Sequence, residues 1–215
     1  MKVGIGEGDK RFKGKIILKN ASINFEDNKI YYLLAPNGAG KTTVFKLIAG
    51  LQILNHGEVR NIYKNNNQLT IFDDLSFYKN LTGYQNISLF TNFKFSSVVV
   101  EKIAQKYEIL DVLYHKVGKY SLGEGKKLSL ILWELLAPRL CIMDEVTNGL
   151  DHTSLKTLKD SFNELKKNSI IILTGHDLGF YEKVIDELYV LRKNKFFKEE
   201  NWKDWGLESI YEKYF

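Results

Sequence analysis

The sequence predicts an α/β fold built on a mostly parallel β-sheet with helices on both of its faces. Two observations support this prediction. Short apolar segments of strand length alternate along the chain with longer segments whose apolar residues recur at helical spacing. The later strand segments, residues 140–143 and 170–173, are apolar throughout, as expected for strands that are buried on both faces.

The composition is that of one globular domain with a full hydrophobic core. The chain has 215 residues, of which 44% are hydrophobic and 27% are charged. The net charge of +5 comes from scattered lysines that are not interleaved with aromatic residues, so no nucleic-acid partner is expected. The longest apolar stretch, residues 128–137, is too short to span a membrane, and the N-terminus lacks the apolar segment of a signal peptide. We therefore expect a cytoplasmic protein, in which the single cysteine, Cys141, excludes an intrachain disulfide.

The N-terminal part of the chain is predicted to consist of strands followed by one helix. Residues 16–18, 21–25 and 30–34 have the apolar character of strands, and a short turn at 26–28 joins the last two. Apolar residues at i, i+3, i+4 and i+7 then predict a helix at 44–51.

The middle of the chain, between Leu81 and Tyr120, has a helical pattern and no comparable strand. Thr82 and Gln85 have the spacing of a capping box, which predicts a helix start. Residues 97–109 predict a second helix. We expect a helical subdomain, at about 76–127, inserted into a single domain that spans 1–215.

The rest of the chain repeats one pattern twice. An apolar stripe predicts a helix at 128–136, which the buried strand at 140–143 follows. A second stripe at 155–165 precedes the strand at 170–173 in the same way.

A phosphate-binding loop is predicted directly after the strand at 30–34, where it opens the next helix. Gly38 and Gly40 let backbone N–H groups turn toward a β-phosphate, Lys41 reaches the β- and γ-phosphates, and the Thr42 hydroxyl can bind Mg²⁺. The strict pattern has glycine at position 35, where this chain has alanine. The predicted nucleotide-binding residues are Asn37, Gly38, Ala39, Gly40, Lys41, Thr42 and Thr43.

Two acids follow the buried strand at 140–143. Asp144 lies where a carboxylate can hold Mg²⁺ beside the phosphates, directly or through water, together with Thr42. Glu145 lies where a carboxylate can polarise an attacking water. A hundred residues after a phosphate loop, this pair indicates a nucleotide-hydrolysing site.

The segment Ser121-Leu122-Gly123-Glu124 resembles the signature motif of ATP-binding cassette (ABC) ATPases, in the variant with leucine in place of the first glycine. Ser121 and Glu124 also have the spacing of a capping box, so the segment can equally start the helix that follows. Both functions are compatible, because a helix N-terminus with a serine hydroxyl is itself suited to a γ-phosphate.

Further motifs follow in the order of that family. Asn148-Gly149-Leu150-Asp151 resembles its D-loop, and His176 resembles its switch histidine, which contacts the γ-phosphate. Phe12 occupies the place of the aromatic residue that stacks on adenine. The segment Leu207–Tyr211 resembles the short closing helix of export-type members.

The resemblance implies a P-loop NTPase fold with an N-terminal antiparallel β subdomain and an inserted helical subdomain. It also implies an ATPase that uses ATP and Mg²⁺, with Glu145 and His176 as catalytic residues. Two subunits would face each other head to tail as a homodimer, or as a heterodimer with another cassette chain. The residues that bind nucleotide in trans would be Ser121, Gly123, Glu124 and Asp151.

The partners that the resemblance implies are separate transmembrane transporter subunits, which would dock near residues 73–91. The chain would then lie peripherally on the inner face of the cell membrane. Its compact size and closing helix favour export of a peptide, a lipid or a drug.

The sequence departs from the family pattern at three further positions. Asp73 lies where the family has the Q-loop glutamine, and its carboxylate could still approach Mg²⁺. Glu124 replaces the glutamine of the signature, and Val146 replaces the proline after the acids. These substitutions leave the phosphate chemistry in place and put the rate of hydrolysis in question.

Two other functions stay open at this point. The first is a weakly active nucleotide-binding subunit that pairs with a different cassette chain, for which Asp73 and Glu124 are the reason. The second is a soluble cassette ATPase that acts on DNA or the ribosome. The second is disfavoured because tandem cassettes, long coiled coils and zinc modules are absent from the sequence.

Overall fold

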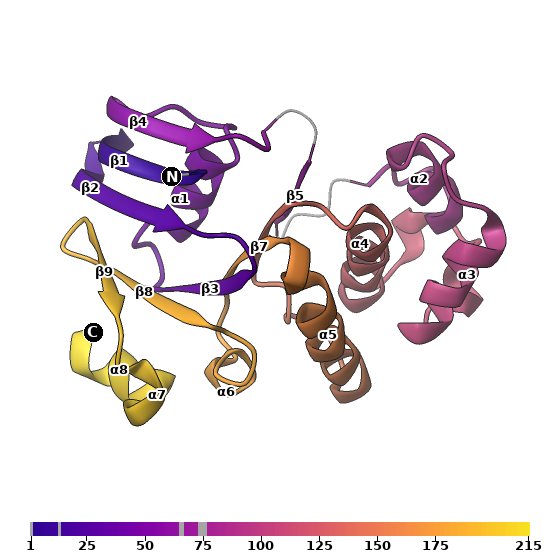
Figure 1. The fold of residues 1–215 in the computed structure, drawn as a ribbon. Helices are drawn as coiled ribbons and strands as arrows, with labels where there is room; N and C mark the ends of the chain where they lie inside the picture. The colour runs from indigo at the N-terminus through magenta and orange to yellow at the C-terminus, as the bar shows by residue number, and fades with distance from the viewer. Residues whose placement is uncertain (1, 13, 65–66, 73–76) are drawn as a thin grey trace.

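The computed structural model describes residues 2–12, 14–64, 67–72 and 77–215, which form two sheets and the helices around them (Figure 1). The larger sheet has the strand order β5-β6-β7-β3-β8-β9, in which every neighbouring pair is parallel except β8 and β9. Its strands are β3 (Lys29–Leu34), β5 (Gln68–Ile71), β6 (Leu140–Asp144), β7 (Ile170–Thr174), β8 (Glu187–Arg192) and β9 (Lys195–Glu199). The mostly parallel sheet that the sequence predicts is therefore confirmed.

The smaller sheet is antiparallel and consists of β2 (Lys15–Phe25), β1 (Val3–Phe12) and β4 (His56–Asn61), in that order. The prediction of separate strands at 16–18 and 21–25 is wrong, because both belong to β2. Asn20, with φ of 44°, marks an irregularity inside that strand, and its backbone N–H donates to the Asp9 side chain. The strand before it, β1, was not predicted from the periodicity.

The two faces of the larger sheet pack into two separate clusters of buried residues. On β3, Ile30, Tyr32 and Leu34 belong to one cluster, whereas Tyr31 and Leu33 belong to the other. This alternation follows from the two-residue repeat of a strand. Both faces are buried, which explains why the parallel strands are apolar throughout.

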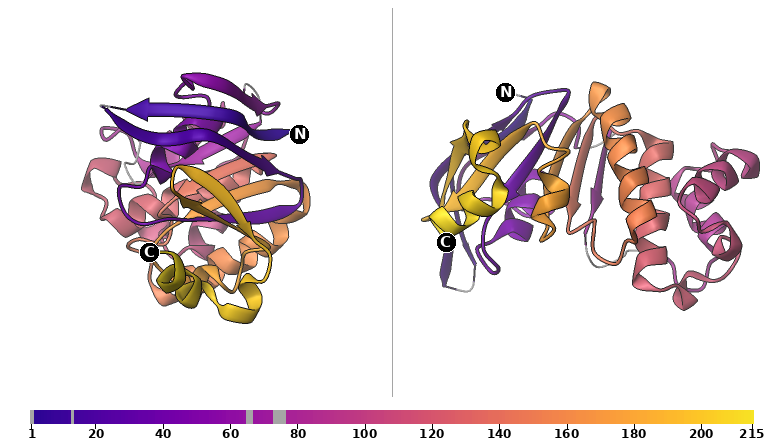
Figure 2. Two further views of the ribbon diagram at one scale, coloured as in Figure 1. Left: turned by 90° about the vertical axis from the view of Figure 1, so that its left-hand side faces the viewer. Right: turned by 90° about the horizontal axis from the view of Figure 1, so that it is seen from below.

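Three helices cover these faces. Helix α1 (Lys41–Ile48) shares a cluster with the smaller sheet, and α4 (Leu122–Leu136) and α5 (His152–Leu165) contribute to the other cluster. Figure 2 (right) shows α4 and α5 between the strands and the remaining helices of the middle segment. The helices predicted at 44–51, 128–136 and 155–165 correspond to these three.

The middle segment is helical, as predicted, with α2 (Gly83–Phe90) and α3 (Ser97–Lys106). Thr82 and Gln85 form the predicted capping box at the start of α2. Helix α4 starts in this segment at Leu122 and continues without a break to Leu136, so it crosses the expected limit of the subdomain at residue 127. Short 3₁₀ helices lie at Leu110–Val112, Val117–Lys119 and Lys166–Asn168.

Glu134, in the last turn of α4, joins three helices. Its carboxylate accepts from Lys106 (2.8 Å) and Tyr107 (2.6 Å) at the end of α3, and from Ser161 of α5 (2.5 Å). The C-terminal end of α4 is thus fixed to helices on both sides.

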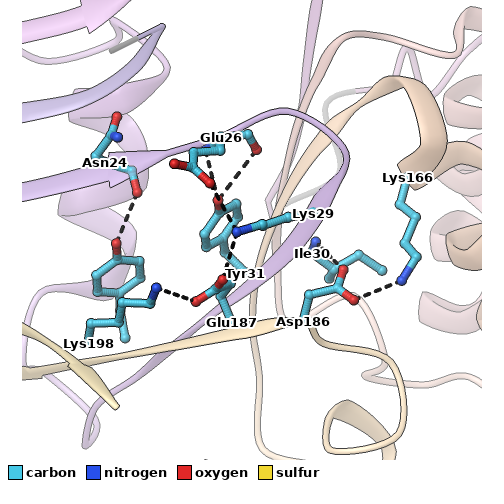
Figure 3. Close-up of polar contacts among 10 residues, drawn as sticks. Asn24, Glu26, Lys29, Ile30, Tyr31, Lys166, Asp186, Glu187 and Lys198 are labelled. Carbon is cyan, nitrogen blue, oxygen red and sulfur yellow. Dashed lines mark hydrogen bonds and ion pairs between the residues drawn. The ribbon is translucent and has the colours of Figure 1, made fainter. Parts of the chain in front are cut away.

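A polar network fixes the amino end of β3 to the strands beside it (Figure 3). Lys29 pairs with Glu26 (3.0 Å) and with Glu187 of β8 (2.8 Å), which also pairs with Lys198 of β9 (2.8 Å). The Asp186 side chain accepts from the Ile30 backbone N–H at 2.9 Å. These contacts fix the register of β3, at whose other end the phosphate loop begins.

The C-terminal part contains α6 (Leu178–Tyr181), α7 (Trp202–Trp205) and α8 (Leu207–Tyr214). The last of these corresponds to the closing helix expected at 207–211. Within the ranges given above, no helix combines the length and the apolar character needed to span a membrane.

Candidate active site

The predicted phosphate-binding loop joins β3 to α1, and two glycines determine its shape. Gly38 and Gly40 have φ values of 72° and 110°, in the left-handed region that favours glycine. A side chain at Gly40 would come within 2.4 Å of Cγ2 of Ile17 on β2. Helix α1 begins at Lys41 without a side-chain cap. Its first N–H groups and the positive end of its dipole are therefore suited to an anion in the loop.

The Lys41 side chain bends back over this loop. Its Nζ donates to the carbonyl oxygens of Ala35 (2.8 Å) and Pro36 (3.3 Å). Burial lowers the pKa of the ammonium group, and the charges of Glu145 and Asp144 act in the opposite direction. Phosphate oxygens can replace the two carbonyl oxygens as partners of the ammonium group. Ala35 does not have a positive φ, so alanine in place of the usual glycine introduces no backbone strain.

Thr42 and Asp144 lie next to each other beside the loop. Thr42 Oγ1 donates to Asp144 Oδ2 at 2.7 Å, which brings the first turn of α1 to the carboxyl end of β6. Asp144 is buried, and burial raises the pKa of its carboxyl group. These hard oxygen donors fit Mg²⁺. In the described parts of the chain, no group of three or more His, Cys, Asp or Glu could hold a metal. Thr42 and Asp144 alone would leave coordination positions of the ion open to phosphate and water.

Glu145 lies between two polar side chains. Its Oε2 accepts from Asn148 Nδ2 at 2.6 Å, and its Oε1 lies 3.2 Å from His176 Nε2. Its backbone N–H donates to the Thr174 carbonyl oxygen at 2.9 Å, which joins the ends of β6 and β7. The φ of Glu145 is 53°, a left-handed conformation that costs a residue with a side chain about 1–3 kcal/mol and that the surrounding contacts must hold in place. The two predicted catalytic residues are therefore in contact.

The signature and D-loop segments also meet. Ser121 caps α4, its hydroxyl accepting from the Glu124 N–H (3.2 Å) while the Glu124 carboxylate accepts from the Ser121 N–H (2.6 Å). A side chain at Gly123 would come within 2.3 Å of the Gly149 carbonyl oxygen, so the two backbones touch. Asp151 caps α5 and pairs with Lys127 at 2.7 Å, and the hydrogen bond from Lys127 lowers the pKa of the Asp151 carboxyl group.

Phe12 lies at the end of β1, where the hairpin to β2 turns, and 49% of its surface is exposed. Its partner in register, Lys15, donates from Nζ to the Gly38 carbonyl oxygen at 2.6 Å. This hydrogen bond holds the start of β2 against the phosphate loop, and the stacking of Phe12 on adenine stays a prediction. Lys15 was not predicted as a site residue, because nothing in the sequence around it distinguishes it from the other lysines of the chain.

A family model described as "ABC transporter" matches residues 18–148. The "Uncharacterized ABC transporter ATP-binding protein YhcH" of Bacillus subtilis (strain 168) is 30% identical over 214 residues, which cover 93% of this chain and 70% of that protein. The chain belongs to the ABC transporter family. It is an ATP-binding cassette ATPase, as the order of its motifs implies.

Two further comparisons agree with this assignment. The "Lantibiotic transport ATP-binding protein SrtF" of Streptococcus pyogenes is 27% identical to this cassette over 94% of the chain and 91% of that protein. The solved dimeric structure of the ATP-binding cassette MJ0796, in a post-hydrolysis state bound to ADP and Pi, superposes with a TM-score of 0.76 at 18% identity. The superposition covers 92% of this chain and 97% of that one. At this identity the superposition confirms the fold.

The positions at which this chain departs from the family pattern lie in different structural surroundings. Asp73, predicted as a metal ligand, lies outside the described residues. Gln68, the glutamine nearest before that position, does not take the place of the Q-loop residue. It belongs to β5, where its side chain bonds to Ala49 and Asn61. Val146 is fully buried in the core, and the Glu145 conformation before it forms without the usual proline.

A cavity of about 270 Å³ opens beside the cassette's phosphate loop. Asn37 and His176 line it from two of the predicted motifs, and Tyr211 lines it from α8. Tyr211 was predicted as part of the closing helix, but not as a residue that lines this cavity. The other predicted residues, Ala39 and Thr43, lie in the loop and in the first turn of α1.

Proposed function

We propose that this cassette hydrolyses ATP at two composite sites of a dimer and thereby powers a separate membrane subunit. The observation that carries the proposal is the convergence of Lys41, Thr42, Asp144, Glu145 and His176. These residues lie at or after the carboxyl ends of three strands, β3, β6 and β7, that are far apart in the sequence. Direct hydrogen bonds or ion pairs join the Thr42–Asp144 and Glu145–His176 pairs. A base, a cation and metal-binding oxygens beside one phosphate loop constitute a phosphoryl-transfer site.

Each side chain has a separate role in this proposal. Lys41 and the N-terminus of α1 bind the phosphates, and Phe12 stacks on the adenine. Thr42 and Asp144 would hold Mg²⁺, which neutralises charge on the phosphates when it is bound. Glu145 orients or deprotonates the attacking water, and His176 contacts the γ-phosphate from the other side.

The signature residues would act on the nucleotide of the other subunit. Helix α4 packs on the face of the larger sheet opposite to α1, and Figure 1 shows the helical segment at the other end of the molecule from the smaller sheet. Ser121 at the N-terminus of α4 therefore has a phosphate partner only if a second subunit supplies one. Head-to-tail pairing meets this requirement at both sites at once.

Mixing two inactive variants tests this arrangement. Lys41→Ala disables the phosphate loop, and Ser121→Asp keeps a good helix cap while it places a negative charge against the γ-phosphate. Each variant alone is expected to lack turnover. In a mixed dimer, the intact phosphate loop of the Ser121→Asp subunit faces the intact signature of the Lys41→Ala subunit. This pair forms one complete site, so phosphate release should return on mixing.

A mixture that stays as inactive as its components would contradict composite sites. If the parent protein alone formed no active dimer, the homodimer would be contradicted. A second, different cassette chain would then be required for activity. Thermal unfolding of each variant provides the control for folding.

For the membrane partner, we propose a transporter that exports a peptide, a lipid or a drug, with the cassette on the inner face of the membrane. The lantibiotic transport function in the name of SrtF supports a peptide. The surface of α2 and its flanks exposes apolar side chains, namely Tyr78, Leu89, Phe90 and Phe93. This patch overlaps residues 73–91, where docking is expected, and such exposed apolar surface is typical of an interaction site.

Phe93→Asp is expected to reduce docking without reducing the ATPase activity of the isolated cassette. Phe93 is 75% exposed and has φ of 57°, a conformation that aspartate tolerates better than phenylalanine. The measurement is recovery of a multi-span membrane protein from solubilised membranes of the source cells on tagged cassette. Ile53→Asp is the matched control, because Ile53 is 82% exposed and lies beside the smaller sheet, where its carbonyl oxygen accepts from Lys10 of β1. Equal recovery with both variants would contradict this docking surface.

A further inference from the structure

Two buried tyrosines lie directly behind the loop that carries His176. The Tyr32 hydroxyl on β3 donates to the carbonyl oxygen of Gly175 at 2.7 Å. The rings of Tyr32 and Tyr181 are 4.8 Å apart between centroids, and both residues are buried almost completely. We infer that Tyr32 and Tyr181 are positioning residues, which fix the backbone of the His176 loop and couple it to the loop after Glu145. The inference rests on the role proposed above for His176.

Gly175 packs directly against the second of these rings. A side chain at Gly175 would come within 2.4 Å of the Tyr181 ring and hydroxyl. The backbone immediately before His176 is thus in contact with an aromatic surface, and Tyr32 bonds the carbonyl group of the same residue. The Tyr181 ring and the Tyr32 hydrogen bond thus both act on Gly175. Together they fix the direction in which the chain leaves β7.

Tyr181 extends this contact to the other catalytic loop. Its hydroxyl lies 3.2 Å from the Thr147 hydroxyl, two residues after Glu145, and both groups are buried. The Glu145 backbone N–H in turn bonds to Thr174, next to Gly175. The tyrosine pair therefore bridges the segments on which Glu145 and His176 depend for their mutual position.

Such support from the backbone matters because the His176 side chain is 54% exposed. Its Nε2 lies 3.2 Å from Glu145 Oε1. Because few side chains surround the half-exposed imidazole, the positions of the two backbones determine whether this contact forms. Two buried hydroxyls are costly unless both are bonded, whereas phenylalanine would fill the same core space. The rings alone would fill the core. The hydrogen bonds of the two hydroxyls to Gly175 and Thr147 additionally fix the positions of the two catalytic loops.

Removing single hydroxyls tests the inference. Tyr32→Phe and Tyr181→Phe keep the rings and are each expected to lower kcat for ATP about five- to tenfold, with KM little changed. Tyr31→Phe is the matched control. Tyr31 directly precedes Tyr32 on β3, and its buried ring packs on the opposite face of the larger sheet. Its oxygen accepts from the Glu26 backbone N–H, within the polar network at the amino end of β3 (Figure 3). This variant should keep the parent kcat. If Tyr31→Phe and Tyr32→Phe lowered kcat equally, a general loss of stability would explain both results, and the inference would be overturned.

A double-mutant cycle with His176→Ala separates this inference from the proposed role of His176. Release of labelled phosphate detects slow turnover, so that variants of low activity can be compared. If Tyr32 acts through His176, Tyr32→Phe should have no further effect in the His176→Ala background. The same fold-loss in both backgrounds overturns the positioning role and leaves His176 in place. Parent activity in His176→Ala itself overturns the proposed role of His176, and the inference with it.

Discussion

Glu145→Gln is expected to abolish ATP turnover while ATP binding stays intact. Glutamine has the size of glutamate and keeps an oxygen for Asn148, but it cannot take a proton from water. Loss of a general base costs about 10²–10⁴-fold in rate. Because the closed dimer can then no longer hydrolyse its nucleotide, it should accumulate with ATP and elute as a dimer in size-exclusion chromatography.

The matched control for this variant is Glu164→Gln on the exposed side of α5, which should keep the parent rate and elution. Hydrolysis by Glu145→Gln at the parent rate would contradict the assignment of Glu145. Slow hydrolysis without a trapped dimer would instead separate the role of Glu145 from the closure of the two subunits.

Lys41→Ala is expected to weaken ATP binding by about ten- to a hundredfold, measured by calorimetry. The ammonium group is the cation of the phosphate loop, and a hydrogen bond to a charged group contributes about 1.5–3 kcal/mol. In the free protein the same group bonds to Ala35 and Pro36, so the variant also loses contacts that order the loop. Thermal unfolding without nucleotide measures that second effect separately.

Lys19→Ala is the charge-matched control, because Lys19 is exposed on β2 and its removal lowers the net charge equally. Its ATP affinity should equal that of the parent. Unchanged affinity in Lys41→Ala would contradict the phosphate loop as the nucleotide site.

The sequence predicted the elements whose signal is local. The phosphate loop, the capping boxes and the buried strands β6 and β7 each depend on residues within about ten positions of one another. Strand β1 was missed because its alternation is weak: Gly4, Gly6 and Gly8 contribute no side chains to either face, and charged residues follow them. Strand β2 was divided in two because Asn20 interrupts its alternation at the irregularity.

Contacts between distant segments could be predicted only through the family resemblance. The sheet order places β3 between β7 and β8, so Tyr32 meets Gly175 across 143 positions of sequence. No periodicity encodes which strands become neighbours. The family resemblance implied that Glu145 and His176 are both catalytic, but it did not state their contact, and the tyrosine pair behind them has no family motif.

Helix α4 has the geometry of a lever. Glu134 anchors one end to α3 and α5, and Ser121 stands at the other end, about 20 Å away for a helix of this length. A tilt of about 5° around that anchor would displace Ser121 by roughly 2 Å, more than half the length of a hydrogen bond. Asp151, held by Lys127, would be carried along. A small rotation imposed on the helical segment is thus enough to make or break the contact of the serine with a phosphate.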